Sequence, residues 1–338
     1  MSPIVEIRAL CKSFPKTHRD PGIRGLVRSW MKPERGMVDA VVDASFSIEE
    51  GEAVALIGPN GAGKSTTLKM LTGILVPSQG EVRVLGLVPW RERTRLALNI
   101  ATVFGQRSQL WYHLPAAETF ELLSRIYEIP RAEYLDRKAE LSRRFELEPL
   151  LGTPVRKLSL GERMRCEIAA SLLHRPRVLF LDEPTIGLDV IAKQQIREVV
   201  RELNQKEGVT VLLTSHDPGD IEVLARRVLV INHGKLMLDD TVTTMKTRFL
   251  RKKLIRLSFA RSVEGLELPR FPGVTELHRS ALSAQLVIDG QECPIERVLT
   301  ACLSAAPIAD VTVEDPPMEE IIAEMYREQR RAEGRAAS

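Results

Sequence analysis

The sequence has few cysteines, and none of them is spaced for metal binding. Its 338 residues include four, which lie far apart and lack histidines at metal-binding spacing: Cys11, Cys166, Cys293 and Cys302. Structural zinc sites and disulfide frameworks use closely and regularly spaced cysteines. We therefore expect reduced thiols and no cysteine-bound metal in this chain.

A long hydrophobic run is also missing. A membrane-spanning helix needs roughly 18 to 20 consecutive apolar residues, whereas the longest apolar runs here, such as VTVLLTS, have the length of a strand. Glu6 and Arg8 stand where the apolar part of an export signal would lie. We therefore expect a soluble, cytoplasmic protein, so any membrane-spanning part must belong to another polypeptide.

The charge balance identifies no partner. The chain carries 48 Lys and Arg against 45 Asp and Glu, which gives a formal net charge of +3. It has no basic stripe interleaved with aromatic residues of the kind that follows a nucleic-acid backbone. We therefore expect no nucleic-acid partner.

Residue patterning predicts an α/β domain over residues 1–235. The β-rich segment 38–58, interrupted by EEGE, predicts a hairpin that leads into a buried strand, AVALIG, and residues 80–86 extend the same β region. Helical spacing predicts a helical subdomain over about 107–157. The apolar runs RVLFLDEP and VTVLLTSH flank a predicted helix and indicate buried parallel strands joined by crossovers.

A second, smaller α+β domain is predicted over residues 236–338. Its predicted strands are LIRLSF, AQLVID and ADVTVE, and its predicted helix is IERVLTACL. A last helix is expected after Asp315 and Pro316, with an apolar stripe formed by Met318, Ile321, Ile322 and Met325. The polar tail that follows should be frayed. The sequence does not decide whether this domain regulates, dimerises or braces the first one.

The most specific motif is GPNGAGKST at residues 58–66, between a predicted strand and a predicted helix. Glycines in this pattern let the backbone wrap around phosphates, while the lysine reaches the β and γ oxygens and the serine hydroxyl can ligate Mg²⁺. The sequence thus predicts an ATP site with Mg²⁺. Its binding residues are Gly58, Asn60, Gly61, Ala62, Gly63, Lys64, Ser65 and Thr66.

A second motif supplies carboxylates for the same site. The apolar run RVLFLDEP brings Asp182 and Glu183 to the polar end of a predicted strand. There Asp182 can hold Mg²⁺ together with Ser65, and Glu183 can polarise an attacking water. By itself this run would only indicate a strand that leaves the core, but together with the phosphate loop it predicts a catalytic centre.

A third motif, LSLGE, precedes a predicted helix and looks suited to an anion. Ser159 and Gly161 lie at a helix N-terminus, where unpaired N–H groups and the helix dipole favour negative charge. The phosphate loop already provides the cradle for one nucleotide, so this surplus anion site indicates a facing partner. Simple helix capping by Ser159 is the alternative interpretation.

Together the motifs GPNGAGKST, LSLGE, LFLDEP, IGLD and LLTSH, in this order, resemble the nucleotide-binding subunit of an ATP-binding cassette (ABC) transporter over roughly residues 4–235. The resemblance implies a P-loop NTPase cassette with a RecA-like parallel sheet core, an antiparallel β subdomain and a helical subdomain. It further implies that Gln106 contacts Mg²⁺ and the membrane partner, and that His216 senses the γ-phosphate. Asp189 would couple two sites and Phe14 would stack on adenine.

The resemblance also gives LSLGE a role in another subunit's site. In this family the segment closes over ATP that is held by the phosphate loop of a second subunit. The expected working unit is a dimer of this chain, or a heterodimer with a related subunit, that encloses two ATP molecules beneath separate transmembrane permease subunits. We expect it to lie peripherally on the inner face of the cell membrane.

Two features depart from the family pattern. The usual LSGGQ is replaced by LSLGE, so Leu160 stands for glycine and Glu162 for glutamine. A leucine restricts the backbone and a carboxylate near the γ-phosphate adds repulsion, so hydrolysis is expected to be slower or more dependent on closure.

The second departure is an insertion at residues 15–37. Its apolar residues share one face of a predicted basic helix: Ile23, Leu26, Val27, Trp30 and Met31. Such a helix could bind an anionic membrane surface, dock on a partner, or pack on its own domain.

Three functional hypotheses remain at this stage. VLGLVPW, VFGQRSQLW and the C-terminal extension are similar to bacterial ATPases that serve ABC-2 type exporters, so the first hypothesis is an exporter ATPase. The second is a nucleotide-sensing adaptor with little turnover, which the unusual LSLGE keeps open. The third is a soluble ABC ATPase that acts on nucleic acid or ribosomes.

Overall fold

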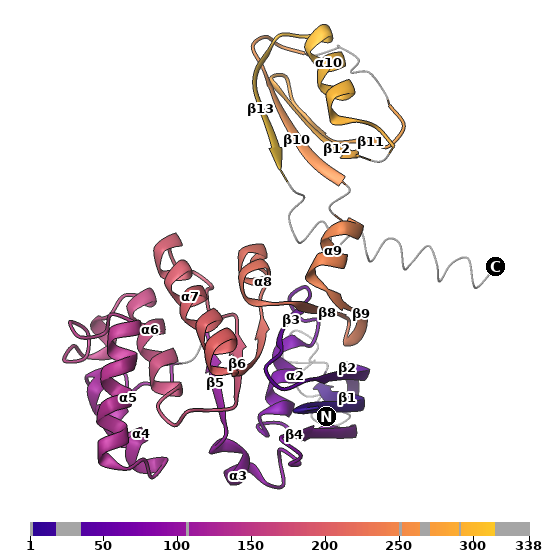
Figure 1. Cartoon of the computed structure of the whole chain (residues 1–338). Helices are drawn as coiled ribbons and strands as arrows, with labels where there is room; N and C mark the ends of the chain where they lie inside the picture. Colours follow the sequence, from indigo (N-terminus) through magenta and orange to yellow (C-terminus); the bar gives the residue numbers. More distant parts are fainter. Residues whose placement is uncertain are drawn as a thin grey trace, which may run out of the picture. The chain divides into compact units, whose positions relative to one another are not determined.

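The computed structural model describes residues 3–17, 35–105, 108–249, 252–263, 271–290 and 292–314. The chain forms two compact units, Met1–Asp240 and Thr241–Ser338 (Figure 1). The helices predicted within the insertion and after Asp315 lie outside the described residues. Among the helices that are described, none is long and apolar enough to cross a membrane.

The first unit is built on a six-stranded sheet with the order β5-β6-β7-β3-β8-β9. Its strands are β3 (Ala53–Ile57), β5 (Ile100–Phe104), β6 (Val178–Asp182), β7 (Thr210–Thr214), β8 (Arg227–Asn232) and β9 (Lys235–Thr241). The pairs that join β5 through β8 are parallel. Every residue of β3 and β7 is buried, as expected for strands covered on both faces, so the predicted parallel core is confirmed.

Helices connect these strands. They are α2 (Lys64–Leu71), α3 (Arg93–Ala97), α7 (Val190–Glu207) and α8 (Pro218–Leu224). Parallel strands need crossovers of this kind because the chain must return to the same end of the sheet before it starts the next strand. Consequently the segments after β3, β6 and β7 all begin at the carboxyl edge of the sheet, where ligands bind in open α/β folds.

An antiparallel sheet with the order β2-β1-β4 forms the β subdomain. It contains β1 (Val5–Thr17), β2 (Arg35–Ile48) and β4 (Gln79–Val84). The hairpin predicted within residues 38–58 was wrong, because β2 pairs with β1 and β3 belongs to the other sheet. Burial explains the difference: β2 alternates buried and exposed positions toward its end, whereas β3 is buried throughout.

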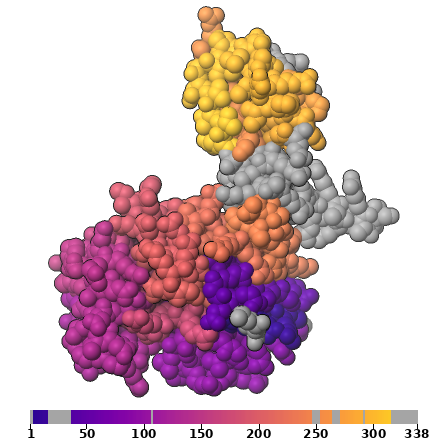
Figure 2. Space-filling view, viewed as in Figure 1, coloured from indigo at the N-terminus to yellow at the C-terminus, as the bar shows by residue number. Residues whose placement is uncertain are grey.

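The helical subdomain contains α4 (Ala116–Ile126), α5 (Arg131–Arg144), a short 3₁₀ helix (Val155–Lys157) and α6 (Leu160–Ser171). Fully buried aromatic side chains, including Phe120, Tyr134 and Phe145, lie inside it. In the space-filling view its magenta surface is continuous with the pink surface of the segment that follows it in the sequence (Figure 2).

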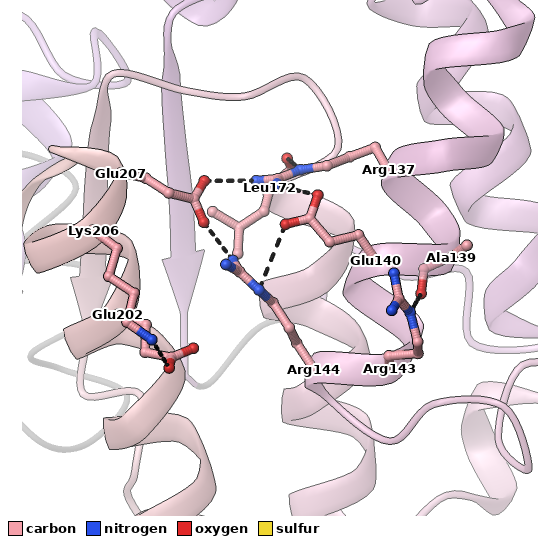
Figure 3. A network of polar contacts seen from close by, with 9 residues as sticks. All are labelled: Arg137, Ala139, Glu140, Arg143, Arg144, Leu172, Glu202, Lys206 and Glu207. Carbon is pink, nitrogen blue, oxygen red and sulfur yellow. Dashed lines mark hydrogen bonds and ion pairs between the residues drawn. The ribbon is translucent and has the colours of Figure 1, made fainter.

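A polar network joins the helical subdomain to the end of α7 (Figure 3). Arg137 of α5 is almost fully buried, and its guanidinium donates to Glu140, to Glu207 and to the carbonyl of Leu172. Arg144, one helical turn from Glu140, also donates to Glu207. A buried guanidinium is stable only when its donors are paired, so this network fixes how α5 sits on the core.

The second unit is a four-stranded antiparallel sheet with the order β11-β12-β10-β13. Its elements are α9 (Val242–Phe249), β10 (Lys252–Phe259), β11 (Val274–Arg279), β12 (Ser283–Asp289), α10 (Ile295–Ala305) and β13 (Ile308–Glu314). Ile255, Ile288 and Val298 are in its own buried core. The first unit extends to Asp240, beyond the boundary drawn after residue 235, because β9 hydrogen-bonds within the six-stranded sheet.

We predict that Glu207→Gln lowers the free energy of unfolding by about 1–2 kcal/mol, because it removes the charged acceptor shared by Arg137 and Arg144. Urea denaturation measures the change. Glu202→Gln is the matched control, since Glu202 lies on the same helix and forms an i,i+4 surface pair with Lys206 worth about 0.3–0.5 kcal/mol. Equal losses in the two variants would contradict the proposed importance of the network.

Candidate active site

Residues 58–63 form the turn between β3 and α2, and two of its glycines are required by close backbone packing. A Cβ on Gly58 would lie 2.1 Å from the carbonyl oxygen of Ile231, and a Cβ on Gly63 would lie 2.3 Å from that of Ala40. Both residues also have a positive φ, which glycine adopts readily. As the N-cap of α2, Gly63 provides no side-chain acceptor. The first N–H groups of this helix are therefore available to an anion.

Lys64 is the first residue of α2, and its side chain is buried. Its ammonium donates to the carbonyl oxygens of Gly58 at 2.6 Å and Pro59 at 3.2 Å. It also lies 3.9 Å from a carboxylate oxygen of Glu183. Burial lowers the pKa of Lys64, and the negative charges of Glu183 and Asp182 oppose that shift. The lysine is thus held over the loop by carbonyl groups and faces the carboxylates.

Asp182 ends β6 and accepts two hydroxyl hydrogen bonds on one oxygen. Ser65 Oγ donates to Asp182 Oδ1 at 3.0 Å, and Thr214 Oγ1 donates to the same atom at 2.6 Å. The three residues come from α2, β6 and the end of β7. A serine hydroxyl beside a carboxylate is a donor set that suits Mg²⁺, which prefers oxygen ligands.

Glu183 follows in a strained backbone conformation. Its φ is +53°, in the left-handed region that non-glycine residues rarely adopt. The N–H of Glu183 donates to the carbonyl and hydroxyl oxygens of Thr214, each at 3.1 Å. Its carboxylate points between Lys64 and the half-exposed ring of His216, whose Nδ1 lies 3.7 Å from Glu183 Oε1. The structure therefore brings together two of the three residues predicted to be catalytic, Glu183 and His216; the third is Gln106.

The LSLGE segment forms the start of α6. Ser159 is the N-cap: its hydroxyl accepts from the N–H of Glu162, and the Glu162 carboxylate accepts from the N–H of Ser159 at 2.8 Å. This is a capping box. The backbone hydrogen bond from Ser159 lowers the pKa of Glu162. The carboxylate that was expected only to repel a phosphate thus has a structural role at the helix end.

The start of α6 packs closely on the start of α7. A Cβ on Gly161 would lie 3.0 Å from Cβ of Ala192 and 4.0 Å from Oδ2 of Asp189. Asp189 caps α7 by accepting from the N–H of Ala192. Leu160 is partly exposed, and its Cδ2 lies 3.1 Å from where a Cβ on Gly187 would be. Gly161 and Asp189 are therefore neighbours within one chain.

The LSLGE segment lies apart from the phosphate loop. In Figure 1, α6 belongs to the helical subdomain, whereas α2 lies beside the antiparallel sheet. Among the described residues, no hydrogen bond or ion pair links Ser159 or Gly161 to residues 58–66. Among the described residues, these contacts therefore do not join the two helix ends that are predicted to bind anions.

Of the two remaining predicted site residues, the structure describes Phe14 but not Gln106. Phe14 of β1 pairs with Val38 of β2, and the same strand brings the carbonyl of Ala40 against Gly63. Phe14 thus lies on the strand next to the one that contacts the phosphate loop, with the ammonium of Lys12 5.1 Å from the centre of its ring. Gln106 lies outside the described residues.

Comparisons with known proteins bear directly on this arrangement. A family model described as ABC transporter matches residues 41–186. The linearmycin resistance ATP-binding protein LnrL of Bacillus subtilis (strain 168) is 30% identical over 300 residues, which cover 86% of this chain and 94% of that protein. The chain belongs to the ABC transporter family.

A further relative of this ABC chain and a similar solved structure are also ATP-binding proteins. The energy-coupling factor transporter ATP-binding protein EcfA1 of Geobacillus kaustophilus (strain HTA426) is 33% identical over 235 residues, 68% of this chain and 79% of that protein. The dimeric post-hydrolysis structure of the ATP-binding cassette MJ0796 with ADP and Pi superposes with a TM-score of 0.60. It is 25% identical and covers 70% of this chain and 98% of that one.

The chain is thus an ATP-binding subunit of an ABC transporter, and it hydrolyses ATP. ABC subunits of this kind typically dimerise and pair with transmembrane subunits.

Sequence reasoning missed the contacts that Thr214 makes in this ABC subunit. The threonine was visible within LLTSH, but its contacts with Asp182 and Glu183 join segments that are 32 and 31 residues away. Only the expectation that parallel strands end at one edge could have indicated it.

We predict that Thr214→Val lowers kcat/KM for ATP about tenfold, because Asp182 and the Glu183 N–H each lose a buried hydroxyl partner, worth about 1–3 kcal/mol. Steady-state ATPase assays measure the change. Thr210→Val is the matched control: Thr210 is equally buried on the same strand, but its hydroxyl accepts from Gly51, away from the site. Equal activity of both variants would show that the Thr214 hydroxyl is dispensable.

Proposed function

We propose that this ABC subunit drives an ABC-2 type exporter by ATP-dependent closure of a dimer. The supporting observation is the extent of the match to the resistance protein LnrL. Because that match covers 86% of this chain, it must continue past Asp240 into the second unit. The match to the energy-coupling factor protein is shorter, at 68% of the chain. Similarity that includes the second unit therefore favours the exporter assignment.

The contacts described above support specific roles in ATP binding. Residues 58–66 and Lys64 would hold the phosphates, and Phe14 would stack on the adenine ring. Ser65 and Asp182, with Gln106, would hold Mg²⁺, which would neutralise phosphate charge when bound. The 3.0 Å contact between Ser65 and Asp182 supports this set.

Glu183 and His216 would act in hydrolysis. With its carboxylate near Lys64 and its backbone fixed by Thr214, Glu183 would orient or deprotonate the attacking water. His216, 3.7 Å away, would contact the γ-phosphate. These contacts differ between the states before and after hydrolysis, so they can bias a two-state closure.

A second copy of the chain would complete each site. Its Ser159 and Gly161 would close over the bound ATP, and its Asp189 would couple the two sites. Large apolar side chains are exposed at this face: Leu160 at the start of α6 and Val190 and Ile191 at the start of α7. Grouped exposed apolar residues mark interaction surfaces, and identical faces suit a two-fold homodimer.

Separate transmembrane permease subunits would bind another surface. Trp111, Tyr112 and Leu114 are all exposed on the segment that follows Gln106, which supports docking of an apolar partner there. The subunit would then lie peripherally on the inner face of the membrane, in the cytoplasm. Nucleic acid is not proposed as a partner.

We predict that Glu183→Gln lowers ATP hydrolysis at least tenfold, equivalent to about 1.4 kcal/mol in the barrier. Because ATP then persists, the variant should form a stable two-subunit species with ATP, which native mass measurement detects.

Adding Ser159→Arg to Glu183→Gln should abolish that dimer, since the arginine side chain would occupy the space of the phosphate. Ser304→Arg, an exposed serine in α10 of the second unit, is the control and should leave the dimer intact. Persistence of the dimer in the Ser159 variant would count against the role of LSLGE in the partner's site.

Export direction is tested with the permease that co-purifies with the intact chain. In everted membrane vesicles the ATPase faces the medium, so an exporter should accumulate linearmycin inside upon addition of ATP. Vesicles that carry Glu183→Gln are the control and should show no ATP-dependent accumulation. ATP-driven loss from preloaded vesicles would contradict the exporter proposal, whereas no ATP-dependent movement would contradict only the choice of linearmycin, the compound in the name of the relative LnrL, as the substrate.

A further inference from the structure

A buried carboxylate outside the phosphate loop lies between the two loops that carry the proposed catalytic residues. Asp220, on α8, has an exposed fraction of 0%. The roles proposed above do not use it, and it is not adjacent in sequence to Glu183 or His216. A fully buried carboxylate is costly unless it is well paired, so its partners indicate what it stabilises.

One oxygen of Asp220 joins the two loops. Thr185 Oγ1 donates to Asp220 Oδ2 at 2.5 Å, and Ser215 Oγ donates to the same atom at 2.7 Å. Thr185 follows Glu183 by two residues in the loop after β6, and Ser215 directly precedes His216 after β7. The carboxylate therefore connects the loop of one catalytic residue to the loop of the other.

The other carboxylate oxygen of Asp220 accepts a hydrogen bond from a residue of α7. Arg197 Nε donates to Asp220 Oδ1 at 2.7 Å, and Arg197 also pairs with Asp217 at 3.1 Å. Asp217 in turn caps α8 and accepts from the ammonium of Lys193 at 2.5 Å. Charge-assisted bonds of this type are stronger and better directed than neutral ones, so Asp220 has a fixed orientation.

Gly219 makes the arginine contact possible. A Cβ on Gly219 would lie 2.8 Å from Nη1 and 2.9 Å from Nη2 of Arg197. The guanidinium therefore lies against bare backbone at the first turn of α8. Its position depends on a residue that has no side chain and bears no charge.

We propose that Asp220 is a positioning residue that fixes the separation of Glu183 and His216. These side chains approach to 3.7 Å, and His216 lies beyond the last residue of β7, outside the hydrogen bonding of the sheet. Asp220 fastens both loops through hydroxyl groups within two residues of each catalytic side chain. This inference rests on the proposed roles of Glu183 and His216 in hydrolysis.

The first test is Asp220→Asn in the full-length chain. The amide oxygen can still accept from Thr185 and Ser215, but its NH₂ group faces the Arg197 donor and repels it. We expect kcat to fall about tenfold while KM for ATP and the dissociation constant of a fluorescent ATP analogue change less than twofold, because the phosphate loop is untouched.

The second test is Gly219→Ala, which displaces the guanidinium without altering any charged group. Alanine has a better helix propensity than glycine by about 1 kcal/mol, which offsets part of the cost of displacing the guanidinium from Asp220, so the variant is assayed at a temperature at which urea denaturation shows that it is fully folded. A purely structural role of the cluster therefore predicts unchanged activity. Our inference predicts a fall in kcat of at least threefold with unchanged KM.

Asp239→Asn is the matched control, since Asp239 forms an arginine–carboxylate pair with Arg227 on the β9 side of the sheet. It should keep wild-type kcat. The double variant Asp220→Asn with Arg197→Gln should recover at least half of the lost activity, because the two amides can pair.

A parallel assay of Glu183→Gln distinguishes a failure of the positioning role of Asp220 from a failure of the proposed function. If Glu183→Gln is inactive while folded Asp220→Asn and Gly219→Ala keep kcat within twofold of wild type, the positioning role is overturned and the proposed function stands. If Glu183→Gln retains full activity, the assignment of the catalytic base fails, and the positioning role fails with it. Equal losses in Asp220→Asn and Asp239→Asn would also overturn the inference.

Discussion

The site depends on one constraint: at Asp182, the end of β6 meets the end of β7 and the start of α2, the helix that follows β3. One carboxylate oxygen of Asp182 accepts hydrogen bonds from the hydroxyl groups of Ser65, in α2, and Thr214, the last residue of β7. This is possible because β3, β6 and β7 are parallel neighbours whose carboxyl ends coincide. The buried apolar strands therefore determine where the polar chemistry can occur. Movement of any one strand would separate the phosphate loop, the acidic pair and the His216 loop from one another.

A second constraint operates between α6 and α7. Small residues at Gly161 and Ala192 let the two helices approach closely at their N-termini, and at the other end of α7 the arginines of α5 hold Glu207. The helical subdomain is thus attached to α7 at both ends. Since α7 begins shortly after Glu183 and ends shortly before β7, the orientation of LSLGE is linked mechanically to the strands that carry the acidic pair.

Much of this could be predicted because it is local in sequence. The phosphate loop, the Asp182–Glu183 pair and the Ser159 cap are short motifs with a physical meaning at each position, and the buried strands have continuous apolar runs. Thr214, Asp220 and Gly219 could not be predicted, since their importance comes from contacts between segments about 20 to 35 residues apart. The pairing of β2 with β1 was missed for the same reason. The alternation within β2 indicates a strand but does not specify its partner.

The carbonyl contacts of Lys64 have one further consequence. A free lysine loses rotamer entropy when it binds a ligand, and that loss weakens binding. Here the ammonium of the buried Lys64 side chain is already restrained by two main-chain oxygens of the loop. Most of this ordering cost is therefore met during folding, so a nucleotide meets a side chain that is already immobilised.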